Sequence, residues 1–225
     1  MLQPSTLNFL RNLKKNNHKE WFDKNREKYE AAKEDFHGLV QEVIIGLSLQ
    51  DKEIAAANLQ VKDCTFRINR DVRFSKDKSP YKSHFAASFN RDKKKMENSA
   101  GYYLHIEPSI QNFIAGGIYM PMPPRLNELR QLISKEFDAW EKIVSEKGFK
   151  KSFPKGVDGI QTLTRPPKGF SEDDPAVEYL KMKSYLVEAE LTQDDILSKN
   201  LGKKILSGFK AMQPMIEFLN QKVNA

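Results

Sequence analysis

The sequence has one cysteine, Cys64, among its 225 residues. A single thiol excludes an intramolecular disulfide and every zinc site built from several cysteines, and it is typical of a reducing compartment. No segment approaches the ~20 consecutive apolar residues that a membrane span needs. The first ten residues lack a charged region followed by an apolar run, so we expect no secretory signal. We therefore expect a cytoplasmic protein without a membrane partner.

The familiar catalytic and metal-binding patterns are missing as well. The four histidines form neither a His-x-His nor a His-Glu-x-x-His motif, and no Gly-x-Ser-x-Gly elbow is present. The glycine patterns of Walker and dinucleotide-binding loops are also absent. From these absences we expect no metal and no cofactor.

Positive charge, in contrast, is in excess and unevenly spread. The formal net charge is +7, and the stretch from Val61 to Lys95 alone holds eleven Lys or Arg and four Asp. The positive and negative charges in the rest of the chain therefore balance. We expect an anionic partner to be drawn to this stretch, most readily an anionic small molecule or a nucleotide, with a nucleic acid or an acidic protein as alternatives.

The most informative part of that basic stretch runs from Cys64 to His84. Its alternation predicts a strand with one apolar face formed by Phe66, Ile68, Val72 and Phe74, and one polar face formed by Arg67, Asn69, Asp71 and Arg73. Arginine forks beside a Lys-rich turn are typical of sites for phosphate or carboxylate groups. The alternative is an exposed strand face with solvated charges and a single Arg–Asp pair.

The pattern of the whole chain predicts an α+β fold, with an antiparallel sheet meander packed on one face by long amphipathic helices. Apolar residues at helical spacing predict N-terminal helices within 5–49 and a further helix over 124–147. Strand patterns place the sheet core at 62–121. The C-terminal part, 149–223, is expected to hold irregular segments, a strand and helices. We predict that residues 1–225 form a single domain.

A second polar group lies on a predicted strand over residues 101–107. Three apolar side chains alternate along this strand, so the polar side chains between them, Tyr103, His105 and Glu107, share its opposite face. Histidine and carboxylate side chains are the usual general acids and bases of enzymes. The candidate catalytic residues of the chain are therefore His84, His105, Glu107 and Asp71.

Several separated stretches carry a resemblance to a known family: Phe66-Arg-Ile-Asn-Arg-Asp-Val-Arg-Phe-Ser-Lys-Asp-Lys-Ser-Pro-Tyr-Lys-Ser-His-Phe, Gly101-Tyr-Tyr-Leu-His-Ile-Glu-Pro, Ala115-Gly-Gly-Ile-Tyr-Met-Pro, Thr164-Arg-Pro-Pro-Lys-Gly-Phe and Lys181-Met-Lys-Ser-Tyr. They resemble the widespread bacterial family called domain of unknown function 2461, over nearly the full length. The resemblance implies a single-domain α+β protein and supplies no activity. Together, the resemblance and the basic stretch nominate the following candidate ligand-binding residues: Arg67, Arg73, Lys78, Tyr81, Lys82, Arg165, Lys181 and Lys183.

Three functions stay open at this point. The first is the binding of a phosphate-bearing or other anionic ligand, with Arg67 and Arg73 as bidentate clamps and Tyr81 as a stacking ring. The second is a hydrolase or phosphoryl-transfer enzyme that uses His84 or His105 as acid or base. The third is a basic protein-interaction module that docks an acidic partner.

Overall fold

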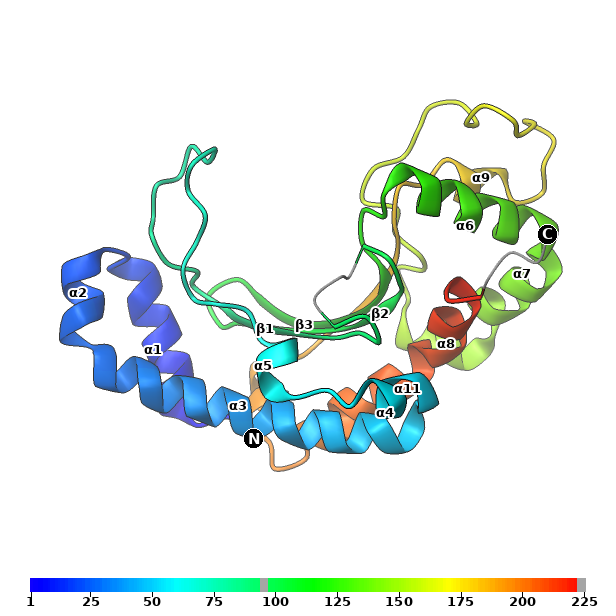
Figure 1. The fold of residues 1–225 in the computed structure, drawn as a ribbon. Helices are drawn as coiled ribbons and strands as arrows, with labels where there is room; N and C mark the ends of the chain where they lie inside the picture. The colour runs from blue at the N-terminus through cyan, green and yellow to red at the C-terminus, as the bar shows by residue number, and fades with distance from the viewer. Residues whose placement is uncertain (94–96, 222–225) are drawn as a thin grey trace.

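An antiparallel sheet lies at the centre of the molecule, with its strands in the order β1-β2-β3-β4 (Figure 1). The strands are β1 (Phe85–Phe89), β2 (Gly101–Glu107), β3 (Gln111–Ile118) and β4 (Tyr185–Glu190). This computed structural model describes residues 1–93 and 97–221. The predicted antiparallel meander is confirmed, because β1, β2 and β3 follow one another in the chain and also pair with one another.

Helices cover one face of this sheet and both of its ends. Those that run under the sheet or beside it are α3 (Arg26–Gln50), α4 (Lys52–Ala57), α5 (Val61–Cys64), α10 (Gln193–Leu197) and α11 (Leu201–Leu219). One end carries α1 (Pro4–Lys15) and α2 (Lys19–Lys24). The other end carries α6 (Pro123–Lys135), α7 (Phe137–Ser145), α8 (Lys147–Ser152) and α9 (Val177–Leu180) (Figure 1). Within the described residues, none of these helices has the length and hydropathy needed to cross a bilayer.

The covered face of the sheet holds the core. On β2 the side chains of Tyr102, Leu104 and Ile106 are buried, and the ring of Phe209 on α11 packs against that of Tyr102 with centroids 5.0 Å apart. Full burial of a large apolar side chain stabilises a fold by about 1.5–3 kcal/mol. The predicted α+β arrangement, with helices packed on one face of the sheet, is therefore confirmed. The other face of the sheet is turned away from α3 and α11 (Figure 1).

Two stretches with continuous apolar periodicity are divided in the structure. Within the predicted N-terminal helices, the apolar pattern over 18–49 is interrupted at Asn25, which separates α2 from α3. The Asn25 side chain donates a hydrogen bond of 2.9 Å to the carbonyl oxygen of Trp21, and such local side-chain bonds compete with the helical backbone pattern. The region 124–147 is likewise divided into α6, α7 and the start of α8. Apolar periodicity follows the buried face across these breaks and therefore does not reveal them.

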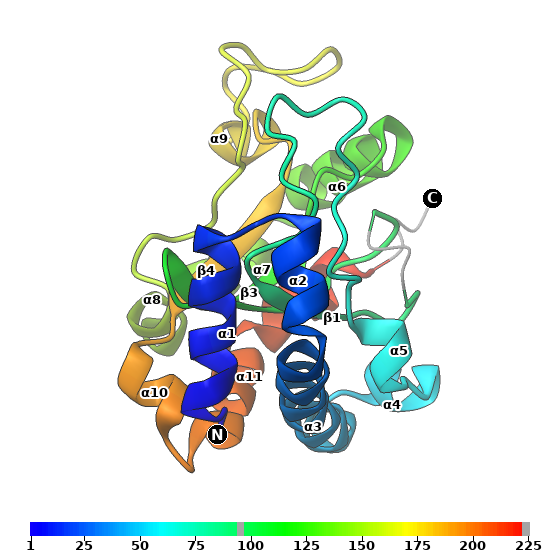
Figure 2. The ribbon, with the colours of Figure 1, turned by 90° about the vertical axis from the view of Figure 1, so that its left-hand side faces the viewer.

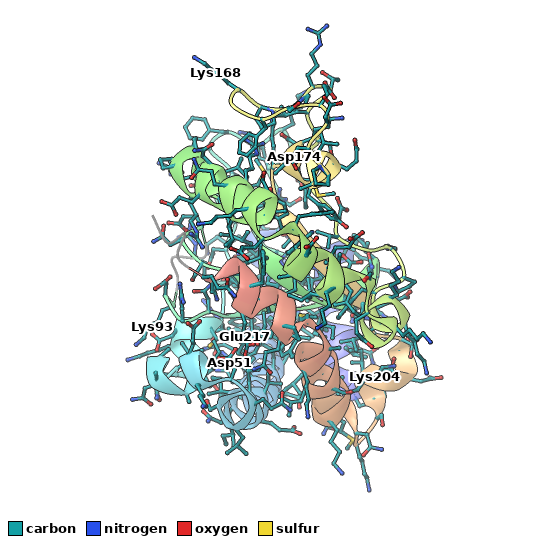
Figure 3. All side chains as sticks on the ribbon, turned by 90° about the vertical axis from the view of Figure 1, so that its right-hand side faces the viewer. Asp51, Lys93, Lys168, Asp174, Lys204 and Glu217 are labelled. Carbon is teal, nitrogen blue, oxygen red and sulfur yellow. The ribbon has the colours of Figure 1, made fainter. Side chains whose placement is uncertain are left out.

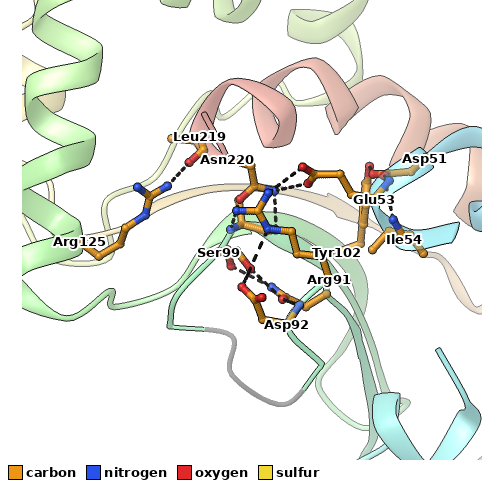
Figure 4. A network of polar contacts seen from close by, with 12 residues as sticks. Asp51, Glu53, Ile54, Arg91, Asp92, Ser99, Tyr102, Arg125, Leu219 and Asn220 are labelled. Carbon is orange, nitrogen blue, oxygen red and sulfur yellow. Dashed lines mark hydrogen bonds and ion pairs between the residues drawn. The ribbon is translucent and has the colours of Figure 1, made fainter. Parts of the chain in front are cut away.

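Polar contacts tie the end of α11 to the connection between β1 and β2 (Figure 4). The Asn220 side chain accepts a bond of 2.9 Å from the backbone N–H of Ala100 and donates one of 3.1 Å to the carbonyl oxygen of the same residue. Arg91 in this connection pairs with Glu53 of α4 at 2.7 Å. These bonds join three segments that are far apart in the chain. We therefore assign this network to the stability of the fold.

Residues 69–81, called the arm from here on, rise from β1 on the open side of the sheet (Figure 2). The two branches of the arm meet at an isolated bridge between Asn69 and Tyr81. Nearer the tip, an ion pair between Arg70 and Asp77 joins the branches again. The arm and the segment between α8 and α9 extend on the same side of the sheet in both Figure 1 and Figure 2.

The strand predicted over 66–74 is wrong. This segment forms no strand: it has an isolated bridge at Asn69 and a few single backbone hydrogen bonds to residues 80–86. Phe74, expected on the buried face, is 96% exposed. The Asp71 carboxylate accepts a hydrogen bond of 3.3 Å from the backbone N–H of Arg73. Aspartates that bond nearby backbone groups favour turns over strands. Alternation of apolar and polar residues was therefore a misleading signal in this stretch.

The base of the arm is anchored to the N-terminal helices. Asn17, between α1 and α2, accepts a hydrogen bond of 3.1 Å from the backbone N–H of Tyr81 and donates one of 2.8 Å to its carbonyl oxygen. The Tyr81 ring stacks on Phe22 of α2 with centroids 4.0 Å apart. Tyr81 is therefore a buried packing residue, which argues against the predicted stacking of its ring on a ligand.

Candidate functional site

A cleft of about 690 Å³ lies over the open face of the sheet. The strands form its floor, Phe66, Lys82 and His84 on either side of the arm form one wall, and residues 155–162 form another. Much of the lining is aromatic or aliphatic, contributed by Phe66, Tyr103, Phe113, Tyr119, Val157, Met182 and Leu186. Pockets of about 300–1,000 Å³ with this kind of lining are the usual sites for small molecules.

Two histidines and a glutamate meet at one edge of the sheet. His105 and Glu107 are two residues apart on β2, so both belong to its open face. The pairing of Phe85 with Ile106 brings His84, just before β1, opposite Glu107. His105 Nε2 lies 3.3 Å from Glu107 Oε2, and His84 Nδ1 lies 3.9 Å from the same oxygen. We call these three residues the His–His–Glu cluster.

Neighbouring side chains hold the orientation of this cluster. Ser83 Oγ donates a hydrogen bond of 2.7 Å to Glu107 Oε1, which leaves Oε2 turned toward the imidazoles. The Tyr103 hydroxyl lies 3.1 Å from His105 Nδ1. Phe113 of β3 stacks on the His105 ring with centroids 4.8 Å apart. The His105 imidazole is therefore held both at its edge and on its face.

The electrostatic state of the cluster follows from its burial and its hydrogen bonds. Burial lowers the pKa of His84 to about 4, and the neighbouring His105 contributes to this shift. Burial also lowers the pKa of His105, against the opposing effect of Glu107. Burial by itself raises the pKa of Glu107, but hydrogen bonds from Ser83 and His105 outweigh it and leave this pKa below its usual range. Near pH 7 the cluster therefore holds two neutral imidazoles and one carboxylate.

The ligand-forming atoms of the cluster all lie within 4.8 Å of one another, so the three side chains could hold one metal ion. The expectation of no metal was based on residue spacing along the chain. That spacing cannot detect a set of ligands that comes from two neighbouring strands. Among the candidate catalytic residues, the structure brings together His84, His105 and Glu107.

Asp71, the fourth candidate catalytic residue, lies apart in the arm. Its carboxylate forms a bidentate pair with Arg73, at 3.0 Å to Nε and 2.7 Å to Nη2. The hydrogen bonds from Arg73 lower the pKa of Asp71. An ionised and fully paired carboxylate is a poor general base, so the arrangement favours a structural role for this pair.

The expected arginine clamp does not form, because its residues do not share a strand. Arg73 is occupied by Asp71 in the arm, and Lys78 donates a hydrogen bond of 3.0 Å to the carbonyl oxygen of Val72. Arg67 lines a second groove, next to α3. Residues 94 and 95 of the basic stretch lie outside the described residues. The expectation that Arg67 and Arg73 project from one strand face is therefore wrong.

The basic candidates from the later motifs are also dispersed. Lys181 pairs with Glu178 at 3.0 Å, and Lys183 donates a hydrogen bond of 3.2 Å to Gln161. Arg165 is exposed on the segment between α8 and α9. Figure 3 shows the same dispersal for other lysines on one side of the molecule: Lys93, Lys168 and Lys204.

Lys82 differs from these cations because it does line the cleft. Its Nζ lies 5.4 Å from the centroid of the Phe66 ring, and no carboxylate in the described residues forms an ion pair with it. Burial lowers the pKa of Lys82, and the nearby Arg67 lowers it further. A half-buried ammonium group without a carboxylate partner is suited to neutralise an anionic group that enters the cleft.

Together, the fold and the cleft define an α+β protein whose antiparallel sheet is covered by helices on one face and open to a cleft on the other. Within that class, the chain belongs to the family of conserved hypothetical proteins DUF2461, whose model matches residues 5–218. The match confirms the resemblance drawn from the sequence motifs. No curated protein and no solved structure matched the chain.

Proposed function

We propose that the protein binds a small molecule with an anionic group and an aromatic or apolar body in the cleft over the sheet. The observation that carries this proposal is Lys82, a half-buried cation in the cleft without a carboxylate partner among the described residues. A charge partly removed from water is stabilised when an opposite charge approaches it. An anionic ligand would therefore bind with its charged end near Lys82.

The rest of the lining suits an aromatic body. The rings of Phe66, Tyr103 and Phe113 lie around the cleft, and the chain of ring contacts from Phe66 to Tyr103 to Phe113 has centroid separations of 6.3 and 5.9 Å. Base stacking on such rings contributes about 1–3 kcal/mol per base. Nucleotides and aromatic phosphates or carboxylates combine a ring with an anionic group. They are therefore the first ligand classes to test.

Thermal-shift screening followed by calorimetry of the purified protein tests this proposal. A ligand at 100 times its Kd that binds only the folded state stabilises it by about 2.7 kcal/mol, which raises Tm measurably. We expect Lys82→Ala to weaken binding of the best ligand at least about tenfold, since loss of a charge-assisted contact removes about 1.5–3 kcal/mol. The control Lys78→Ala, which removes the same charge in the arm, should change Kd less than about twofold.

Two results would count against the proposal. One is a ligand whose affinity falls equally in the Lys82 and Lys78 variants, which would mean attraction by the overall charge. The other is the absence of binding throughout the nucleotide, aromatic phosphate and aromatic carboxylate classes. In the second case a basic protein-interaction module would become the better explanation, with the arm as a docking surface.

A hydrolase or phosphoryl-transfer enzyme is the second candidate function. It is favoured by the contacts of His105, which joins Tyr103 and Glu107, and by the position of His84 in the cleft. A neutral imidazole facing a bound ligand can act as a general base. If a phosphate or carboxylate ester is turned over, we expect His84→Ala to lower kcat by about 10²–10⁴-fold, the usual range for general acid–base catalysis.

A further inference from the structure

We propose that the His–His–Glu cluster binds one divalent first-row transition ion, for which Zn²⁺ is the probe. This inference goes beyond the proposed function, because the three side chains could bind a metal ion whether or not an organic ligand occupies the cleft. Two imidazoles and one carboxylate are a common ligand set for zinc and for other first-row metals.

The distances within the cluster suit a single ion. Ligand atoms at about 2.0–2.2 Å from one metal lie about 2.8–3.6 Å from each other when they are neighbours in octahedral or tetrahedral geometry. His105 Nε2 and Glu107 Oε2 are 3.3 Å apart, which is already within this range. His84 Nδ1 is 3.9 Å from the same oxygen, so a small rotation of its side chain would complete the set.

The contacts around the cluster are those that support metal ligands. When Nε2 of a histidine binds a metal, its Nδ1 keeps the proton and needs an acceptor. The Tyr103 hydroxyl oxygen lies 3.1 Å from His105 Nδ1 and can accept that bond. Ser83 holds Glu107 Oε1 at 2.7 Å, which directs Oε2 to the metal position. Both supports come from the same edge of the sheet as the ligands themselves.

The cluster also leaves room for ligands from outside the protein. Its side chains are partly exposed, with 26% for His84, 12% for His105 and 11% for Glu107. Three protein ligands with further positions open to solvent are typical of catalytic metal sites, whereas structural zinc sites are closed by four protein ligands. Because His84 also lines the cleft, a water or a ligand atom on the metal would face the cleft.

Calorimetric titration of the chelator-treated full-length protein with ZnCl₂ tests this inference. We expect one ion per chain, a higher Tm with zinc than without it, and with Co²⁺ an absorption spectrum typical of nitrogen and oxygen ligands. His105→Ala and Glu107→Gln should weaken zinc binding by more than about 10–100-fold, since losing a supporting contact alone has an effect of that size. Tyr103→Phe, which removes only the acceptor of His105 Nδ1–H, should weaken zinc binding by about 10-fold or more.

The two histidines outside the cluster provide matched controls. His18→Ala and His37→Ala should leave the zinc affinity unchanged, and melting of each variant without metal shows whether it is folded. The inference is overturned if the folded protein takes up no zinc, or if the control variants weaken binding as much as His105→Ala does. If Lys82→Ala still binds zinc, the metal site is independent of the contact that Lys82 is proposed to make with the organic ligand. Each of the two proposals can then fail without the other.

Discussion

At the scale of single residues, the surroundings of a side chain decide its role more than its type does. Arg73 and Lys82 are both cations of the basic stretch, but Arg73 is paired with Asp71 in the arm, whereas Lys82 lines the cleft without a carboxylate partner in the described chain. His105 likewise acquires its orientation from Tyr103 and Phe113. Residue type alone therefore gives too many candidate functional residues, and the contacts of each side chain distinguish between them.

Gly117 on β3 is a residue for which the structure allows no side chain. Its φ of 126° is strained for any residue with a Cβ, and a Cβ there would overlap the carbonyl oxygen of Tyr185 on β4. We expect Gly117→Ala to lower the free energy of unfolding by about 2–5 kcal/mol, from backbone strain and overpacking together. Urea unfolding measures this difference. As a control, Gly38→Ala lies within α3 with nothing near its Cβ position, and it should raise the stability by up to about 1 kcal/mol.

At the scale of elements, the arm shows how a few backbone and side-chain bonds can hold two chain segments together without a regular sheet. Its branches are joined by a bridge between Asn69 and Tyr81 and by the pair of Arg70 with Asp77, and Asn17 holds its base. These few bonds fix one wall of the cleft, because Lys82 and His84 directly follow the arm. We therefore expect the shape of the cleft to depend on the anchor at Asn17.

Asn17→Ala tests that dependence. The substitution removes both hydrogen bonds to the backbone of Tyr81 and leaves partly buried backbone groups without partners, so we expect a loss of about 1–3 kcal/mol in unfolding free energy. We also expect faster proteolytic cleavage within the arm. Asn127→Ala on the exposed surface of α6 should change stability by less than about 0.5 kcal/mol. Equal effects of the two substitutions would mean that Asn17 does not anchor the arm.

At the scale of the whole molecule, one cluster of buried apolar residues extends from the N-terminal helices to α11. It includes Leu10 of α1, Val43 of α3, Leu104 of β2, Trp140 of α7 and Phe209 of α11. A shared core couples the parts of a chain during unfolding. This continuity supports the single-domain prediction, which a measurement of cooperativity can test.

Unfolding should therefore occur in one transition. Trp21 lies at the α2 end of the molecule and Trp140 at the α7 end, so each tryptophan reports on one side of the core. In the Trp21→Phe and Trp140→Phe variants, we expect the fluorescence of the remaining tryptophan and the far-UV circular dichroism to change at the same urea concentration. Two separate midpoints within one variant would mean that the two ends unfold as separate units.

The sequence by itself determined the α+β class, the antiparallel meander and the shared face of Tyr103, His105 and Glu107, because alternation along a strand is a local property. Family membership was also evident from motifs. The tertiary structure decided which polar residues meet: His84 joins the pair on β2 through strand register, and Arg67 and Arg73 are separated because their segment is not a strand. Contacts between segments depend on pairing and packing, which the local periodicity of a sequence does not contain.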